Sequence, residues 1–136
     1  MTAITCIEGI GPKYQKKLAE NGIRSCEKLL EAGATRKGRK ELAEACGIDE
    51  KRVLGWVNRA DLFRVRGVST QYSDLLEAAG VDTVKELRRR RADNLSEAMT
   101  AANARRKNKL VRQVPVESQV QRWIDHAKEL DPVVKY

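Results

Sequence analysis

The feature that most constrains this chain is an internal repeat with a spacing of 58 positions. Five glycine, tyrosine and leucine landmarks of the first half recur unchanged in the second half, as in a duplicated helical unit. The landmarks are Gly9, Tyr14, Leu18, Gly22 and Leu29, and their counterparts are Gly67, Tyr72, Leu76, Gly80 and Leu87. Trp56 and Trp123 lie 67 positions apart, nine more than the repeat spacing. We place these nine extra residues around Asn94 to Lys109, and we expect two domains, 1–60 and 61–136.

Helix signals recur along both halves. Ser25 and Thr35 are typical residues for the start of a helix, and Gly47 is typical of a helix end. Thr83 and Glu86 have the spacing of a capping box, in which each side chain bonds the other residue's amide. Apolar residues follow helical spacing, and no segment alternates long enough to be a strand. The sequence therefore predicts an all-α fold of two helical halves, each of about five helices.

The aromatic residues and the single histidine have simple structural interpretations. Trp56 and Trp123 fall on apolar stripes, so we expect both in the core. Tyr14 and Tyr72 each follow a glycine turn by five positions, and packing beneath the turn is the favoured role. His126 has no histidine or cysteine partner at metal-ligand spacing, and we expect it on the surface.

The start of the first half combines a glycine turn with a basic helix. Gly9, Ile10 and Gly11 allow a tight turn in which Ile10 points inward, and Pro12 suits the first turn of the helix that follows. The first amides of a helix lack intrahelical partners and favour anions. A phosphate therefore fits this end, and the nearby lysines Lys13, Lys16 and Lys17 add positive charge. Glu8 places a negative charge beside it.

These residues resemble the helix-hairpin-helix motif, in which apolar-Gly-apolar-Gly precedes a helix that ends at Gly-Ile. Gly22 and Ile23 complete the pattern here. The resemblance implies hairpin amides that hold a nucleic-acid phosphate without reading base sequence, with a monovalent cation at the hairpin carbonyls as the only implied cofactor. The alternative is a turn that only packs the fold, because a pair of glycines is a weak signal.

The second half keeps a weaker version of this hairpin, at Gly67, Val68 and Ser69. Ser69 replaces the second glycine, and its hydroxyl can cap the next helix instead. Longer segments resemble a bacterial family of tandem helix-hairpin-helix proteins described as a domain of unknown function, the 4332 family. They are Leu42–Ile48, Trp56–Leu62, Leu75–Val81 and Gln119–Ile124. The resemblance covers nearly the whole chain and implies two SAM-like helix-hairpin-helix repeats packed in series.

Charge and cysteine content narrow the partners and the compartment. The 136 residues carry a formal net charge of +8, which attracts polyanions. The three cysteines form no C-x-x-C pair, so we expect neither a zinc site nor a disulfide framework. No stretch resembles a secretory signal or a membrane span. We expect a cytoplasmic protein that binds nucleic acid, DNA rather than RNA, and no membrane; its oligomeric state stays open.

Three basic clusters are further candidates for phosphate contacts. They are Arg36, Lys37, Arg39 and Lys40; Arg88, Arg89, Arg90 and Arg91; and Arg105, Arg106, Lys107 and Lys109. Charge runs at helix ends are also often solvated or complement a helix dipole. The sequence has no recognisable nucleophile with a base, carboxylate pair or metal cage, so we expect no enzyme. The alternative to nucleic-acid binding is a protein-interaction adaptor that docks on an acidic partner.

Overall fold

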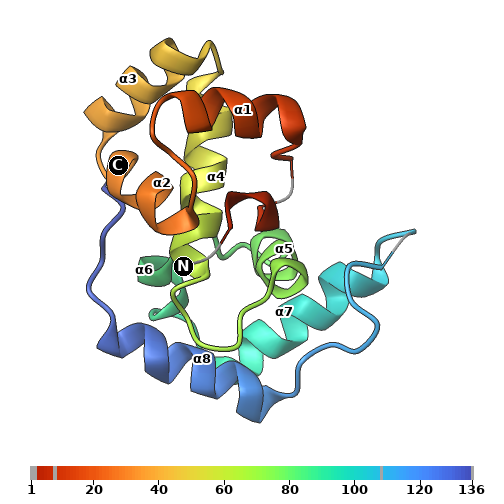
Figure 1. Cartoon of the computed structure of the whole chain (residues 1–136). Coiled ribbons are helices and arrows are strands. Elements are labelled where there is room, and N and C mark those ends of the chain that lie inside the picture. Colours follow the sequence, from red (N-terminus) through yellow and green to blue (C-terminus); the bar gives the residue numbers. More distant parts are fainter. Residues whose placement is uncertain (1–2, 8, 108, 136) are drawn as a thin grey trace. The chain divides into compact units, whose positions relative to one another are not determined.

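The computed structural model describes residues 3–7, 9–107 and 109–135. This part of the chain is helical, with eight α-helices, one short 3-10 helix and no strand (Figure 1). An isolated antiparallel bridge joins Ala3 and Ser25. None of the helices in these residues is long and apolar enough to cross a lipid bilayer. The predicted all-α fold is confirmed.

The first of two compact units consists of Met1–Asp61 together with Val133–Tyr136. Its elements are η1 (Ile4–Cys6), α1 (Pro12–Glu20), α2 (Cys26–Ala32), α3 (Arg36–Cys46) and α4 (Glu50–Leu62), whose last residue falls in the second unit. The side chains of Ser25 and Thr35 accept hydrogen bonds from the amides of Lys28 and Gly38, at 3.2 and 3.1 Å. Helix α3 ends at Gly47, whose φ is +66°. These helix boundaries follow from local chemistry, as predicted.

Helix α4 provides the apolar face against which the first unit packs. Val53 and Val57 are fully buried, and Trp56 and Ala60 are 5% and 3% exposed. These four positions have the i, i+3, i+4, i+7 spacing of one helix face. The predicted core position of Trp56 is confirmed.

The second unit spans Leu62–Pro132. Its helices are α5 (Thr70–Ala78), α6 (Val84–Leu87), α7 (Ala92–Ala104) and α8 (Glu117–Glu129). Leu75, Leu87 and Met99 from three of these helices are fully buried in one cluster with Trp123 and Ile124 of α8. Trp123 is therefore a core residue, as predicted.

The helices recur at the spacing of the sequence repeat. Both ends of α5 lie 58 positions after those of α1, α6 begins 58 after α2, and α7 ends 58 after α3. Both ends of α8 lie 67 positions after those of α4. The nine extra residues therefore belong to the connection 105–116, where the first half has only 47–49. Their predicted position around Asn94 to Lys109 is wrong in its first part, because residues up to Ala104 are helical, and each half has four described α-helices rather than five.

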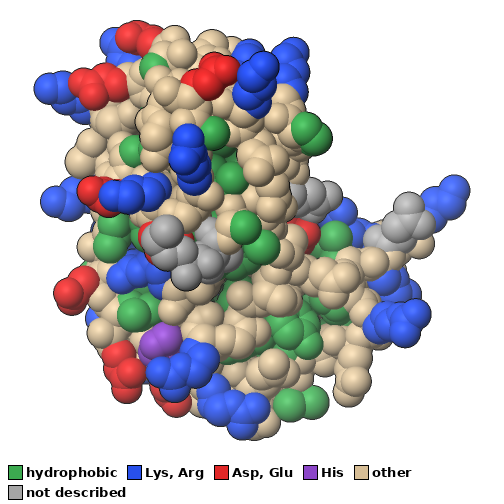
Figure 2. Space-filling model, viewed as in Figure 1, with side chains coloured by type: hydrophobic (Ala, Val, Ile, Leu, Met, Phe, Trp, Pro, Cys, Tyr) green, Lys and Arg blue, Asp and Glu red, His purple; other side chains and the backbone are tan. Residues whose placement is uncertain are grey.

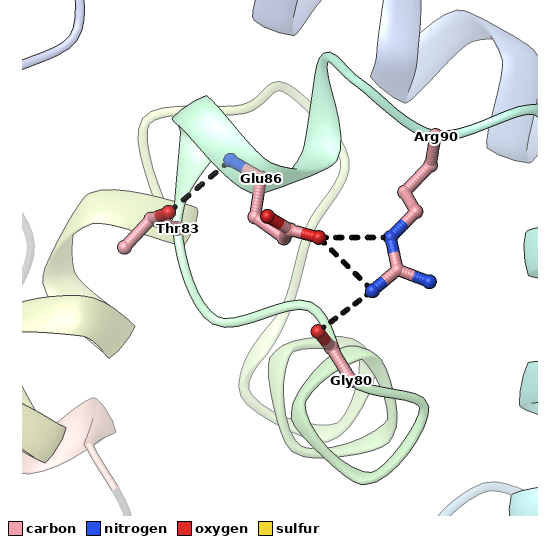
Figure 3. A network of polar contacts seen from close by, with 4 residues as sticks. All are labelled: Gly80, Thr83, Glu86 and Arg90. Carbon is pink, nitrogen blue, oxygen red and sulfur yellow. Dashed lines mark hydrogen bonds and ion pairs between the residues drawn. The ribbon is translucent and has the colours of Figure 1, made fainter.

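The predicted capping box at α6 is only half formed. The hydroxyl of Thr83 accepts a hydrogen bond from the amide of Glu86 at 3.2 Å, as the box requires (Figure 3). The Glu86 carboxylate, however, binds the guanidinium of Arg90 at 3.0 and 3.1 Å. A charged partner one turn away thus takes the carboxylate that the box would have used at the helix start.

Candidate functional site

The first predicted hairpin is the turn between η1 and α1, and two buried isoleucines anchor it. Ile7 and Ile10 are 1% and 5% exposed, and the Ile10 amide donates to the Ile7 carbonyl at 3.2 Å. Gly9 between them has a φ of +94°, a conformation that disfavours any side chain. A Cβ on Gly9 would also lie 3.5 Å from the indole nitrogen of Trp56. Since 3.5 Å is an ordinary contact distance, Gly9 is explained by its backbone conformation, and Ile10 points inward as predicted.

Gly11 is different, because nothing within the fold requires a glycine there. Its φ of −86° and ψ of −176° are extended values that other residues adopt readily. A Cβ at this position would meet no atom within 4 Å. Gly11 is nevertheless the residue that caps α1, and glycine supplies no capping oxygen. The start of α1 is therefore exposed, and no side chain of Gly11 caps its first-turn amides.

Three lysines of α1 follow this end of the helix. Lys13 and Lys16 are exposed on α1, whereas Lys17 is half-buried one turn further on. The carbonyl of Lys17 accepts from the side-chain amide of Asn21 at 2.9 Å and from the Cys46 thiol at 3.7 Å. The C-terminal half of α1 is therefore held against α3, while its N-terminal half keeps two freely exposed lysines. Glu8, the predicted negative neighbour, lies outside the described residues.

Arg52 of α4 is a basic residue of this site that sequence reasoning missed. Its guanidinium donates to the Tyr14 hydroxyl at 2.8 Å and lies 5.2 Å from the centre of the Tyr14 ring. Tyr14 in turn packs against Trp56, with ring centres 5.3 Å apart. Arg52 precedes Trp56 by four positions, so both lie on one face of α4. That spacing was the available signal, but only the fold shows that Tyr14 lies beside this face.

The second hairpin repeats this construction with one change. Val65 and Val68 are buried, the Val68 amide donates to the Val65 carbonyl at 3.2 Å, and Gly67 has a φ of +91°. The hydroxyl of Ser69 accepts a hydrogen bond from the Tyr72 amide at 3.3 Å. The predicted capping role of Ser69 is confirmed. One of the first-turn amides of α5 is therefore already occupied by the protein itself.

His126 of α8 is tied to the second hairpin. Its Nδ1 accepts a hydrogen bond from the Arg66 backbone amide at 2.9 Å, and the side chain is half-buried. The side chain lies at the surface, as predicted (Figure 2), but it also makes this hydrogen bond within the fold. The imidazole supports the chain just before Gly67, so its observed role is structural.

The first basic cluster, on α3, is divided by the fold. Arg36, Lys37 and Lys40 are exposed, but Arg39 is only 5% exposed. The Arg39 guanidinium donates to the carbonyls of Gly33, Ala34 and Lys135, at 2.9, 3.4 and 2.8 Å. It joins the C-terminal residues to the first unit, so we leave Arg39 out of any phosphate-binding surface.

Most of the second cluster is also used within the fold. Arg90 bonds the Gly80 carbonyl at 3.0 Å in addition to Glu86 (Figure 3). Arg91 pairs with Asp93 at 2.9 Å, and Arg88 donates to the Lys128 carbonyl at 3.3 Å. Arg89 is exposed. Gly80 follows α5 with a φ of +97°, so Arg90 stabilises the turn that ends this helix.

The third cluster lies on the long connection between α7 and α8. Arg105, Arg106, Lys107 and Lys109 are all exposed. In Figure 2, Lys and Arg side chains stand out from this connection, which extends past the end of α7 in Figure 1. Of the three predicted clusters, this one leaves all its members on the surface.

The cysteines contribute no site in the residues that the structure describes. Cys6, Cys26 and Cys46 are all free thiols. Burial raises the pKa of Cys26 to about 12, with smaller contributions from Glu27 and Cys6, so this thiol stays protonated at neutral pH. Within residues 3–7, 9–107 and 109–135, no group of three His, Cys, Asp or Glu side chains could hold a metal ion.

Comparison with known proteins places the chain in one family. Residues 8–130 match the family described as "Domain of unknown function (DUF4332)". The match covers most of the chain, so the protein belongs to this family. No curated protein and no solved structure gives a significant match.

Proposed function

We propose that this protein is a non-enzymatic nucleic-acid-binding protein built from two tandem helix-hairpin-helix repeats. It binds the phosphate backbone of DNA, in preference to RNA, with little dependence on base sequence. The observation that carries the proposal is Gly11, an exposed glycine at a helix start where neither the backbone nor a neighbouring atom requires one. A bare helix start with room in front of it is suited to accept a phosphate oxygen.

The charge distribution supports a polyanion as the ligand. Residues 1–60 carry 12 basic and 8 acidic side chains, and residues 61–136 carry 15 and 11, so each half contributes +4. Lys13 and Lys16 lie within the first two turns of α1, close to its open end. Electrostatic attraction of this kind strengthens with the number of phosphates neutralised and carries no sequence information.

The two hairpins are expected to contribute unequally. In the first, Gly11 has no side chain that could cap the α1 amides; in the second, the Ser69 hydroxyl accepts a hydrogen bond from the Tyr72 amide. The second hairpin is also followed by Gln71 and Asp74 rather than by lysines. We therefore assign the main phosphate contact to the first hairpin.

The test compares two triple variants that remove the same charge. One variant replaces Lys13, Lys16 and Lys17 together by Gln. The control variant replaces three other residues by Gln, the exposed Arg24, Lys28 and Lys85. Binding of a fluorescent DNA duplex is measured by anisotropy across a salt series. The first variant should lose affinity and flatten the plot of log affinity against log salt, by about 0.9 for each lost contact. The control variant should change this slope of log affinity against log salt less. Both triple variants must keep the melting temperature of the parent.

An adaptor that docks on an acidic protein is the second candidate. The internal hydrogen bonds of Arg39 and Arg90 weaken the argument from net charge to nucleic acid, because part of the basic charge stabilises the fold. Val116, 57% exposed just before α8, would suit a protein contact. Under this alternative, neither triple variant should alter DNA binding more than the other, and the residual binding should be weak at physiological salt.

A further inference from the structure

The second unit contains a groove that is lined partly by the long connection between α7 and α8. The groove has a volume of about 630 Å³ and lies between the start of α5 and the connection that follows α7. Its lining includes Gln71 and Tyr72 on one side and Lys109 and Arg112 on the other. The connection is the site of the nine extra residues, where the first half has only 47–49. The groove is therefore an addition to the shared helical plan.

A buried side chain holds the connection in place. Asn103, near the end of α7, is 5% exposed. Its carbonyl oxygen accepts from the amides of Leu110 and Val111 at 2.9 and 3.3 Å, and its amide nitrogen donates to the Val111 carbonyl at 3.1 Å. Val111 itself is 5% exposed in the core. Lys109 and Arg112 flank this fixed pair, so both cations are carried by an ordered stretch of backbone.

Tyr72 differs from its counterpart Tyr14 in what covers it. The Tyr14 ring has the Arg52 guanidinium 5.2 Å from its centre and bonded to its hydroxyl. The position on α8 that corresponds to Arg52 is Gln119, which brings no charge to the Tyr72 ring. Tyr72 packs against Trp123, with ring centres 5.2 Å apart, while part of its half-buried side chain lines the groove.

We propose that this groove binds single-stranded nucleic acid, with one unpaired base stacked on Tyr72 and the adjoining phosphates held by Lys109 and Arg112. An aromatic ring and two cations in one groove suit the alternation of base and phosphate along a single strand. In a duplex the bases are paired and stacked on one another, so their faces cannot reach the ring. The exposed Arg105, Arg106 and Lys107 extend the positive charge beside the groove.

This inference rests on the proposed function and assigns a different role in binding to each unit. The first hairpin would bind backbone phosphates of any strand, because Gly11 does not cap the first-turn amides of α1. In the second unit, Ser69 caps the helix start, and the groove beside it distinguishes single strands from duplexes.

The experiment uses the full chain with two labelled DNA probes, an oligo-dT strand of about 15 nucleotides and a duplex of equal length. Affinities are measured by anisotropy at fixed salt for the parent, Tyr72→Leu, Tyr72→Phe and the pair Lys109→Gln with Arg112→Gln. Tyr14→Leu is the matched control, because it removes the same packing against a tryptophan in the first unit. Melting curves set a temperature at which every variant is folded.

We expect Tyr72→Leu to weaken single-strand binding about tenfold and to leave duplex binding nearly unchanged, while Tyr72→Phe stays close to the parent. The double variant Lys109→Gln with Arg112→Gln should also lower the affinity for the single strand more than the affinity for the duplex. A 2-aminopurine base in the single strand should be quenched by the parent and by Tyr72→Phe, and not by Tyr72→Leu. Tyr14→Leu should show no such selectivity.

The inference is overturned if Tyr72→Leu lowers both affinities equally or neither, or if the Phe variant behaves like the Leu variant. In that case, duplex binding that still depends on the α1 lysines would leave the proposed function intact. If the parent binds neither probe, the proposed function and this inference fail together.

Discussion

Exchanging the two helix-capping residues tests the phosphate site with the least disturbance to the fold. The variants are Gly11→Ser, which gives α1 the cap that α5 has, and Ser69→Gly, which gives α5 the bare start of α1. A Cβ at Gly11 meets nothing within 4 Å, and the backbone there is extended, so Gly11→Ser introduces no strain. The exchange changes one hydroxyl group at each hairpin.

The expected effects on stability and on binding differ in sign and size. Serine and glycine differ by only a few tenths of a kcal/mol, roughly, as capping residues, so Gly11→Ser should melt at or slightly above the parent temperature. A hydrogen bond to a charged group contributes about 1.5–3 kcal/mol, and a serine hydroxyl that occupies a first-turn amide takes it from the phosphate. Duplex affinity should therefore fall about ten- to a hundredfold.

Ser69→Gly provides the matched control. The variant loses the 3.3 Å hydrogen bond to the Tyr72 amide and should be less stable by roughly a few tenths of a kcal/mol. Its duplex affinity should stay near the parent value, because α5 has no lysines near its start. The assay is anisotropy with a DNA duplex, alongside thermal melting. If Gly11→Ser binds the duplex as tightly as the parent, the assignment of the α1 amides to phosphate is refuted.

Two further predictions concern the glycine turns and the buried thiol. Gly9→Ala and Gly67→Ala should each cost about 1–2 kcal/mol in stability because of the positive φ, and Gly67→Ala should cost more, since its Cβ would lie 3.1 rather than 3.5 Å from a tryptophan nitrogen. Urea unfolding measures both, and equal costs would contradict the packing argument. Because burial raises the pKa of the Cys26 thiol, the unfolded chain releases this proton near the ordinary thiol pKa of 9.0, whereas the folded chain keeps it up to about pH 12. Stability from this group is therefore present below pH 9 and lost as the pH rises toward 12, and Cys26→Ala should show a smaller loss over that interval in melts.

Much of the fold was predictable because its causes are local. The caps at Ser25, Thr35 and Thr83 join residues three positions apart, so a short stretch of sequence contains both partners. The buried face of α4 follows from helical spacing alone. The extra residues were placed too early because α7 continues the helical pattern to Ala104, and a pattern of spacing does not mark where an insertion begins.

The candidate site was predictable only in part. The open end of α1 was visible in the sequence, because Gly11 and Pro12 determine it by their own chemistry. The roles of the basic clusters were not visible in the sequence, because similar runs of basic residues lie in different surroundings after folding. Arg39 is bonded to carbonyls of Gly33 and Lys135, whereas its neighbour Lys40 is exposed.

The sequence by itself determined the helices, their repeat and the buried tryptophans, since these depend on residue type and on spacings of three, four and 58 positions. Tertiary structure alone decided which cations face solvent and what covers each tyrosine. The Arg39–Lys135 bond spans 96 positions and the Arg52–Tyr14 bond spans 38. Partners this far apart meet only after the chain has folded, and no local pattern records which distant carbonyl or hydroxyl will satisfy a given guanidinium.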